Sequence, residues 1–429
     1  MKSSHPKATL TRNQTLWEQL GPGLITGAAD DDPSGIATYS QVGATFGYAL
    51  LWTAIFTWPL MVGIQVVCAR IGRVSGSGIA ANMRMYSKPW LLYGAVALLL
   101  IANTINIAAD VGAMGAALKL LIGGPAQLYA VLFGLMSLLL QMFVPFPRYS
   151  PFLKVLTLAL FAYVATVFIV KVPWAHVVYR TLVPEAAFNV NYIVATVAVF
   201  GTTISPYLFF WQASQEVEEQ RASPAEKPLK LAPDQARRNL RRIKTDTYIG
   251  MAFSNLIAFF IILTAAVTLH AKGLTNVATS AQAAEALRPL AGQYAFYLFA
   301  AGIVGTGLLA VPVLAGSAAY AVAEAFNWRI GLGRRVMKAR GFYTILTVAT
   351  VLGVALNFTP MDPIKALFWS AVINGVIAVP IMVIVMLLSG RTEVMGDFVV
   401  KGSLRLLGWA ATVIMAIAVI VMFATWGHQ

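Results

Sequence analysis

Three consecutive aspartates at positions 30–32 precede Pro33 and Gly35 in a stretch that is otherwise apolar over residues 20–48. Because proline has no N–H to donate and displaces its predecessor from helical geometry, a helix here should break at Asp32. A charge at membrane depth is costly and usually faces a cavity that serves a substrate or an ion. Broken membrane helices that carry carboxylates are common cation sites, so the motif predicts a carrier of a divalent metal ion.

A second interruption lies in the apolar segment 190–215, where Gly201 and Pro206 bracket a run of small hydroxylic residues. The two broken segments are five helices apart. Paired breaks in corresponding positions of two halves indicate an inverted repeat with the substrate site between them. Carbonyls freed at the two breaks, together with Asp32, would supply oxygen ligands. The alternative is that each proline only kinks its helix.

The composition is that of a membrane protein. Hydrophobic residues make up 59% of the 429 residues, charged residues only 11%, and the mean hydropathy is +0.73. A soluble domain has about a quarter charged residues. The single cysteine, Cys68, excludes an internal disulfide and gives no sign of a metal–thiolate site. Residues 1–17 are polar, so we expect no cleaved signal peptide and insertion through the first membrane helix.

Apolar segments long enough to span a bilayer recur along the chain. Eleven are predicted, at residues 20–47 (interrupted), 49–69, 91–121, 126–145, 152–172, 190–215 (interrupted), 247–270, 294–325, 342–356, 364–389 and 404–426. We therefore expect one transmembrane transporter domain over residues 1–429. Its predicted soluble parts are a cytoplasmic N-terminal tail at 1–19 and a cytoplasmic loop with a short amphipathic helix at 216–245.

The basic residues are distributed unevenly over the connecting loops. With the N-terminus in the cytoplasm, 25 of the 31 Lys and Arg residues fall on the cytoplasmic side. This asymmetry follows the positive-inside rule and predicts that orientation. It also accounts for the net charge of +14, because basic residues gather in cytoplasmic loops, where they can contact anionic lipid headgroups. No nucleic-acid partner is therefore expected.

Several motifs together resemble those of the Nramp divalent-metal transporters. They are Gly21-Pro22-Gly23, the Asp32-Pro33 break, Ala37-Thr38, Phe46-Gly47-Tyr48 with Leu51-Trp52, Leu118-Lys119-Leu120-Leu121-Ile122-Gly123 and the break in segment 190–215. The resemblance covers most of the chain and is strongest over residues 20–65. It implies an all-α membrane protein with the LeuT fold: two inverted five-helix repeats, helices 1 and 6 broken mid-membrane, and an eleventh transmembrane helix.

Two departures from the family motifs concern the ligands. The transition-metal type has Asp-Pro-Gly-Asn in helix one, where this chain has Gly35 in place of the asparagine. In helix six that type has Met-Pro-His, where this chain has Ser205-Pro206-Tyr207. Sulfur favours softer transition metals, whereas Mg²⁺ prefers oxygen ligands and retains several waters. The pattern is similar to the Nramp-related magnesium transporters and predicts partly hydrated Mg²⁺ as cargo, with Mn²⁺ also carried.

The residues that would relay protons also differ. Alignment to the family places Ile107 at the first of two acidic positions in helix three and Asp110 at the second. The two helix-six histidines fall on Tyr207 and Gln212, which do not titrate near neutral pH. We therefore expect transport without proton coupling. An inside-negative potential favours cation entry by about 2.3 kcal/mol per charge per 100 mV, so a divalent ion needs no proton for accumulation.

The resemblance also implies roles for individual residues. Asp32 is the expected metal ligand, Ala29 and Thr202 are expected to offer backbone carbonyls, and Gly35 and Ser205 to shape the cavity and hold water. Possible accessory residues are Asp31, Asp110, Tyr207 and Asn374. No resident cofactor is expected, because the metal is the transported ion.

Other functions remain open at this point. The nearest is a proton-coupled Mn²⁺/Fe²⁺ importer of the same family, against which the missing methionine and histidines count. A LeuT-fold amino-acid carrier is a second, although three carboxylates at the break would repel a substrate carboxylate. A non-transporting receptor would have no use for paired breaks, and an enzyme is not expected, since no nucleophile, base or cofactor motif appears. We expect an integral multi-pass protein of a bacterial-type plasma (inner) membrane; a monomer is compatible with the sequence.

Overall fold

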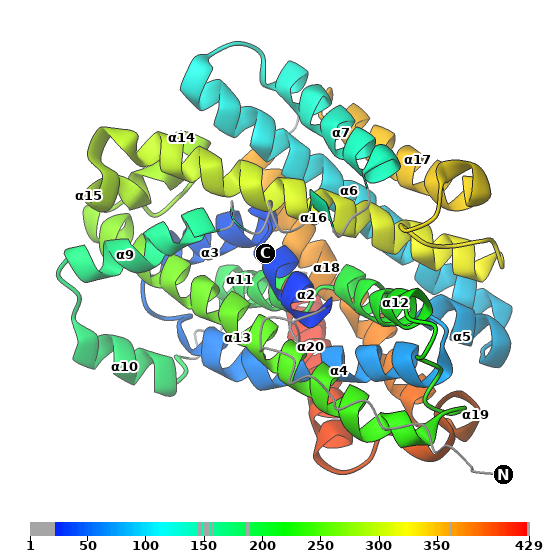
Figure 1. Cartoon of the computed structure of the whole chain (residues 1–429). Helices are drawn as coiled ribbons and strands as arrows, with labels where there is room; N and C mark the ends of the chain where they lie inside the picture. The colour runs from blue at the N-terminus through cyan, green and yellow to red at the C-terminus, as the bar shows by residue number, and fades with distance from the viewer. Residues whose placement is uncertain are drawn as a thin grey trace, which may run out of the picture.

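The computed structural model describes residues 22–144, 148–149, 155, 158–185, 189–360 and 362–426, and within these ranges every regular element is a helix (Figure 1). The first half contains α2 (Pro22–Asp30), α3 (Pro33–Phe46), α4 (Trp52–Ser75), α5 (Ile79–Tyr86), α6 (Pro89–Ile122), α7 (Ala126–Phe143), α9 (Phe161–Ile169) and α10 (Trp174–Leu182). The second half contains α11 (Val190–Thr203), α12 (Pro206–Ala222), α13 (Ala236–Thr268), α14 (Ser280–Ala284), α15 (Arg288–Ala291), α16 (Ala295–Ala325), α17 (Arg340–Leu356), α18 (Pro363–Ser389), α19 (Thr392–Met395) and α20 (Gly402–Trp426).

The predicted membrane segments correspond to these long helices. Eight helical stretches of the described chain are long and apolar enough to cross a bilayer, and Leu158–Ile169 and Arg340–Leu356 are shorter apolar helices. The remaining predicted span is the interrupted pair α2–α3. Segment 152–172 is only partly described, since residues 156–157 and most of those before them fall outside the described ranges.

Both predicted breaks are present. Helix one stops at Asp30 and restarts at Pro33, with Asp32 as the N-cap, in extended backbone geometry. Helix six stops at Thr203 and restarts at Pro206, with Ser205 at the cap position. Proline suits the first position of a helix because no intrahelical partner exists for an N–H there. The prolines therefore begin second half-helices rather than kinking continuous ones.

Each broken helix crosses one neighbouring helix at close range, and the two crossings occupy equivalent positions in the two halves of the chain. A Cβ on Gly27 of α2 would lie 2.3 Å from the carbonyl oxygen of Gly250 on α13, and one on Gly72 of α4 would lie 2.2 Å from that of Ala213 on α12. Helix one thus packs on helix seven as helix six packs on helix two, with glycines allowing backbone contact. This is the pairing that two five-helix repeats require.

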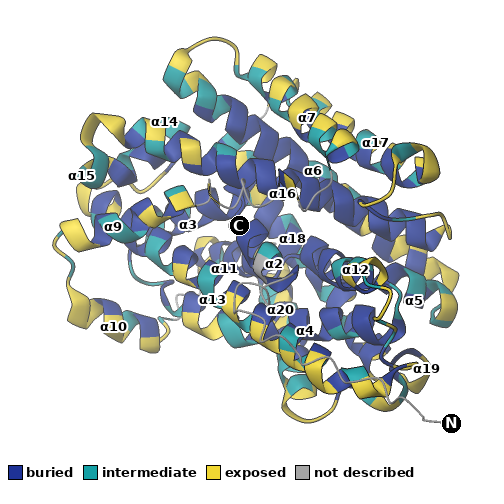
Figure 2. Ribbon diagram, viewed as in Figure 1, coloured by how far each residue is buried: buried dark blue, intermediate teal, exposed yellow. Residues whose placement is uncertain are grey.

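The broken helices lie in the middle of the molecule. In Figure 1, α6, α7, α16 and α17 lie on one side of α2, α11 and α12, and α4, α13 and α20 lie on the other. Figure 2 shows the central helices buried over most of their length, whereas α7 carries an exposed apolar face that includes Leu132, Leu135 and Leu139. Such a face suits contact with lipid.

The loop predicted at 216–245 is shorter than expected. Helix α12 continues to Ala222 and α13 already begins at Ala236, with a single turn of 3₁₀-helix at Pro233–Gln235 between them. The charged residues assigned to a loop therefore extend two long helices beyond their apolar parts. The predicted N-terminal tail, 1–19, lies outside the described residues.

Candidate cation-binding site

Asp32 lies between the two half-helices of helix one and is only 2% exposed. Its Oδ1 accepts a hydrogen bond of 2.7 Å from the Gly35 N–H, which caps α3. Its Oδ2 lies 3.4 Å from the hydroxyl of Tyr207 on α12. The carboxylate is therefore fixed at one oxygen by the helix that it begins, while the other oxygen faces the second broken helix.

Tyr207 connects the two breaks. Its hydroxyl donates a 3.0 Å hydrogen bond to the carbonyl oxygen of Ala29, close to the end of α2. The same hydroxyl is the neighbour of Asp32 Oδ2. Two predicted oxygen donors, the Ala29 carbonyl and the Asp32 carboxylate, are thus brought together around one phenol, which the sequence suggested only as an accessory residue.

Gly35 and Thr202 face each other across the α3–α11 contact. A Cβ on Gly35 would lie 3.2 Å from the Thr202 hydroxyl oxygen and 3.4 Å from the Asp30 carbonyl oxygen. The glycine therefore allows helix one to approach helix six at the break. Ser205 donates to the carbonyls of Gly201 at 2.8 Å and Thr202 at 2.9 Å. Its hydroxyl thus satisfies carbonyls that the break releases.

Helix α18 closes another side of the site. The Ser34 hydroxyl donates to the Leu367 carbonyl at 3.0 Å and lies 3.3 Å from the Ser370 hydroxyl. Asn374, two turns further along from Leu367, is buried, and its Oδ1 has no hydrogen-bond partner among the described residues. Asn374 therefore lies on the helix that contacts Ser34, and within the described chain no hydrogen bond joins it to Asp32 or Tyr207.

Asp30 and Asp31 face helix seven instead. The Ser254 hydroxyl on α13 lies 2.6 Å from Asp30 Oδ2 and 3.1 Å from Asp31 Oδ1. Both side chains are buried, and within the described ranges the second oxygen of each has no hydrogen-bond partner. The accessory candidate Asp31 is therefore adjacent to Asp32 in sequence but shares a partner with Asp30.

Asp110 approaches the site from α6. Its electrostatic neighbours are the Asp32 carboxylate and the backbone N–H of Ser34, at the start of α3. One turn earlier, Asn106 is fully buried, and both of its amide atoms are unpaired as far as the described residues go. Ile107 instead packs on α17, where a Cβ on Gly353 would lie 2.6 Å from it. Of the two helix-three positions, only that of Asp110 faces the break.

The charge balance of this region is unusual. Four buried carboxylates, those of Asp30, Asp31, Asp32 and Asp110, surround the break, and none forms an ion pair with any described residue. An uncompensated buried charge is strongly destabilising. The described residues contain no group of three His, Cys, Asp or Glu side chains arranged to hold a metal ion. The arrangement favours a transient cation held by carboxylate, carbonyl and water oxygens over a resident metal cage.

A family model described as "Natural resistance-associated macrophage protein-like" matches residues 23–425. The chain belongs to the Nramp family. Members of this family are transporters, so this Nramp protein is an integral multi-pass membrane transporter and not an enzyme.

Named relatives agree with this assignment. The Divalent metal cation transporter MntH of Klebsiella pneumoniae (strain 342) is 28% identical over 407 residues, 93% of this chain and 91% of that protein. A mutant of the Eremococcus coleocola manganese transporter superposes with a TM-score of 0.75 at 18% identity, over 97% of this chain and 88% of the other. Mhp1, a nucleobase-cation-symport-1 family transporter, superposes with a TM-score of 0.58 at 15% identity, over 95% of this chain and 93% of Mhp1. The predicted LeuT fold, with two inverted five-helix repeats and an eleventh helix, is confirmed.

Two polar residues of this Nramp protein make contacts with the first half of helix one and its break that the sequence did not predict. Ser254, which contacts both Asp30 and Asp31, is one, and Gln212 is another, since it accepts a hydrogen bond from Thr26 of α2. Ser254 and Asn255 are adjacent polar residues inside an apolar span, and polar residues in membrane helices usually bond to neighbouring helices. That signal could have marked α13 as a partner of helix one.

Proposed function

We propose that this Nramp protein carries divalent metal cations, chiefly partly hydrated Mg²⁺ and also Mn²⁺, between the two helix breaks. The observation that carries the proposal is the donor set around Tyr207: its hydroxyl lies 3.0 Å from the Ala29 carbonyl oxygen and 3.4 Å from Asp32 Oδ2. All three groups offer oxygen atoms. Mg²⁺ prefers oxygen ligands, whereas softer transition metals are selected by sulfur ligands. Ala29, Gly35, Thr202 and Ser205 complete the proposed site with Asp32.

Hydration of the cargo is proposed from the way these oxygens are already bonded. Asp32 Oδ1 caps α3, and the Ala29 carbonyl accepts from Tyr207. Few protein oxygens are left for direct bonds to a bare ion, and Mg²⁺ usually retains several waters when it binds protein. We propose no direct metal ligand among Asp31, Asp110 and Asn374. These residues would instead attract the cation electrostatically or form hydrogen bonds to its bound waters.

Transport without proton coupling is the second part of the proposal. It is supported by the tyrosine at position 207, by Gln212 on the same half-helix, and by Ile107, which faces α17. None of these side chains titrates near neutral pH. We also propose that the protein lies in a bacterial-type plasma membrane with a cytoplasmic N-terminus and a cytoplasmic α12–α13 connection, as the distribution of basic residues favours.

A proton-coupled Mn²⁺ importer is the second candidate. The buried carboxylates of Asp30, Asp31 and Asp110 favour it, because each has an oxygen without a hydrogen-bond partner in the described part of the chain. The relative named a divalent metal cation transporter and the solved manganese transporter also support it.

The test is uptake into proteoliposomes that contain a Mg²⁺-sensitive dye and a pH-sensitive dye. We expect Mg²⁺ entry without acidification of the lumen. Asp32→Ala should weaken it by about ten- to a hundredfold, because a hydrogen bond to a charged group such as a carboxylate contributes about 1.5–3 kcal/mol and each 1.4 kcal/mol is about tenfold in affinity. Asp397→Ala, which removes an exposed aspartate on the loop after α19, is the matched control and should transport normally. Acidification that accompanies Mn²⁺ uptake, with no Mg²⁺ entry, would instead establish the second candidate.

A further inference from the structure

An apolar groove of about 480 Å³ lies between α4, α10 and α13, away from the helix breaks. Its walls include Ile55 and Trp58 from α4, Val178 and Leu182 from α10, and Leu256 and Phe259 from α13. In Figure 1, α10 lies beside the start of α4 and below α9. The groove runs from this short helix along two long membrane-spanning helices.

The groove opens to the surface of the spans rather than into the protein. Ile55, Val178 and Leu256 are 48%, 53% and 49% exposed. Since α4 and α13 cross the membrane, a surface exposed on them within the hydrocarbon layer meets lipid and not water. The medium that fills this groove in the membrane is therefore hydrocarbon.

The amide of Asn255, which lines the groove, is already hydrogen-bonded within the protein. Asn255 Oδ1 accepts a 3.0 Å hydrogen bond from Thr57, and its amide nitrogen donates to the Met251 carbonyl at 3.2 Å. The Thr181 hydroxyl, which also lines the groove, donates to the Val177 carbonyl at 2.6 Å, and among the lining side chains of the described residues the buried Nε1 of Trp58 has no partner. An occupant therefore needs few hydrogen-bonding groups along this part of the groove. That requirement suits an alkyl chain and disfavours a polar ligand.

Helix α10 has the properties of a helix at the membrane interface. It buries Val177 and Thr181 and exposes Trp174 and Tyr179, two residue types that concentrate at headgroup level. Amphipathic helices of this kind lie in the plane of the interface. Its end of the groove should therefore be at the depth of the phosphate groups.

Two basic residues flank α10 at that depth. Lys171 is exposed, three residues before the helix, and Arg180 lies within it. Arg180 forms a 2.6 Å ion pair with Glu185 through Nη1 and is 30% exposed. A guanidinium has five N–H donors, so the pair leaves others for a phosphate.

We propose that this groove binds one acyl chain of a phospholipid, whose phosphate is held at the α10 end by Lys171 and Arg180. The proposal does not depend on which cation is carried or on proton coupling. It places a lipid against α4 and α13, the helices that pack on the two broken helices through Gly72 and Gly250. Occupancy of the groove should therefore influence how readily those crossings shift during transport.

Tryptophan quenching tests the chain-binding part. The protein is reconstituted in phosphatidylglycerol vesicles whose acyl chains are brominated near their middle, and emission is compared with that in unbrominated vesicles. The difference between wild type and Trp58→Phe isolates the emission of Trp58, which lines the groove together with Trp174. We expect Trp58 to be quenched more strongly than the average of the ten tryptophans, because a bound chain lies against its half-buried ring.

A groove-filling variant separates a bound chain from ordinary contact with the bilayer. Ala252 lines the groove, and Ala252→Phe should at least halve the quenching of Trp58. Ala97→Phe, at an exposed position on α6, is the matched control and should leave it unchanged. Equal quenching of Trp58 in wild type and Ala252→Phe, with both proteins still folded by thermal melting, would overturn the proposal in favour of general lipid contact.

The phosphate contact is tested by native mass spectrometry during detergent washing. Wild-type protein should retain one phospholipid longer than the double variant Lys171→Gln/Arg180→Gln. Loss of the lipid at the same detergent concentration in both proteins would refute the role of the two basic residues.

Discussion

At the scale of single residues, the two carboxylate oxygens of Asp32 have different roles. One oxygen caps α3 through the Gly35 N–H, and the other faces Tyr207 and is free to interact with a cation or its water. A cap that is kept during transport would hold the second oxygen in a constant orientation. The phenol of Tyr207 contacts both this oxygen and the Ala29 carbonyl, so in the proposed site it is the residue expected to decide between bare and hydrated ions.

The Tyr207→Phe variant tests this dependence. Without the hydroxyl, the Ala29 carbonyl and Asp32 Oδ2 become available for direct coordination, which favours an ion that gives up water more easily than Mg²⁺. A neutral hydrogen bond contributes about 0.5–1.5 kcal/mol, so the Mn²⁺-to-Mg²⁺ preference should rise by about two- to tenfold. Competition between the two ions in proteoliposome uptake measures that ratio.

A second tyrosine provides the control for Tyr207. Tyr192 lies near the start of α11, about three turns before the break at Thr203, and its hydroxyl accepts from the Trp52 indole at 3.0 Å. Tyr192→Phe should leave the ion preference unchanged. An unaltered ratio in Tyr207→Phe as well would mean that the phenol has no part in ion selection.

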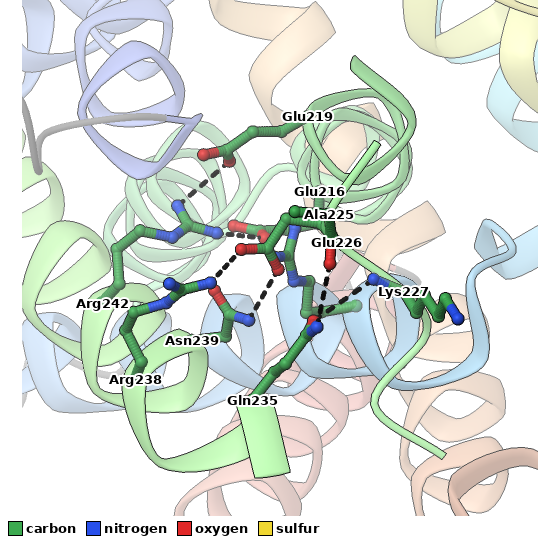
Figure 3. Close-up of polar contacts among 10 residues, drawn as sticks. Glu216, Glu219, Ala225, Glu226, Lys227, Gln235, Arg238, Asn239 and Arg242 are labelled. Carbon is green, nitrogen blue, oxygen red and sulfur yellow. Dashed lines mark hydrogen bonds and ion pairs between the residues drawn. The ribbon is translucent and has the colours of Figure 1, made fainter. Parts of the chain in front are cut away.

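At the scale of helices, the inner half of helix six is tied to its neighbours by charged groups. Figure 3 shows Glu216 and Glu219 of α12 facing Arg242 of α13, with Arg238 and Glu226 beside them. Arg73, at the end of α4, also pairs with Glu226. Helices two, six and seven are thus joined on the side of the molecule where the basic residues predict cytoplasm.

The variant Arg242→Ala tests how much this network stabilises the helices. Its Nη2 lies 2.5 Å from Glu216, which is completely buried, so the substitution leaves a buried carboxylate without its nearest cation. Loss of one partner of a buried pair costs about 3–5 kcal/mol. We expect a melting temperature several degrees lower in detergent, measured by thermal unfolding, and partial recovery in the double variant Glu216→Gln/Arg242→Gln.

Arg238 provides the comparison within the same network. Its side chain is 69% exposed, although it also pairs with Glu226. Exposed ion pairs contribute at most about 1 kcal/mol, so Arg238→Ala should melt close to wild type. If Arg238→Ala and Arg242→Ala lowered the melting temperature by the same small amount, the buried ion pair of Arg242 with Glu216 would not contribute more to stability than the exposed one.

At the scale of the whole molecule, the sequence predicted the features that depend on local patterns. Apolar length located the spans, and Pro33 and Pro206 located both breaks, because a missing N–H acts at its own position. The contact of Tyr207 with Ala29 and that of Ser254 with Asp30 depend on how distant helices are rotated against each other. No local pattern encodes that rotation. The helical extensions to Ala222 and from Ala236 were missed because their charged residues lack the apolar signal used to find spans.

The net charge that the whole molecule moves across the membrane in each cycle decides how the membrane potential drives transport. If cations pass without protons, each Mg²⁺ moves two charges across the membrane. A potential of about 100 mV then contributes about 4.6 kcal/mol, enough for roughly a thousandfold accumulation. We therefore expect a potassium gradient with valinomycin, inside negative, to increase Mg²⁺ uptake strongly.

The response to a proton ionophore distinguishes the two mechanisms under the same potential. With the potential clamped by valinomycin, an ionophore collapses only the pH gradient, so an uncoupled carrier should take up Mg²⁺ at an unchanged rate. A coupled carrier would respond, because Asp110 or its acidic neighbours would then have to release a proton into the lumen for each turnover. Uptake that follows the pH gradient at constant potential would therefore assign the buried carboxylates to a proton path, whereas uptake that follows the potential alone leaves them as the field that attracts the cation.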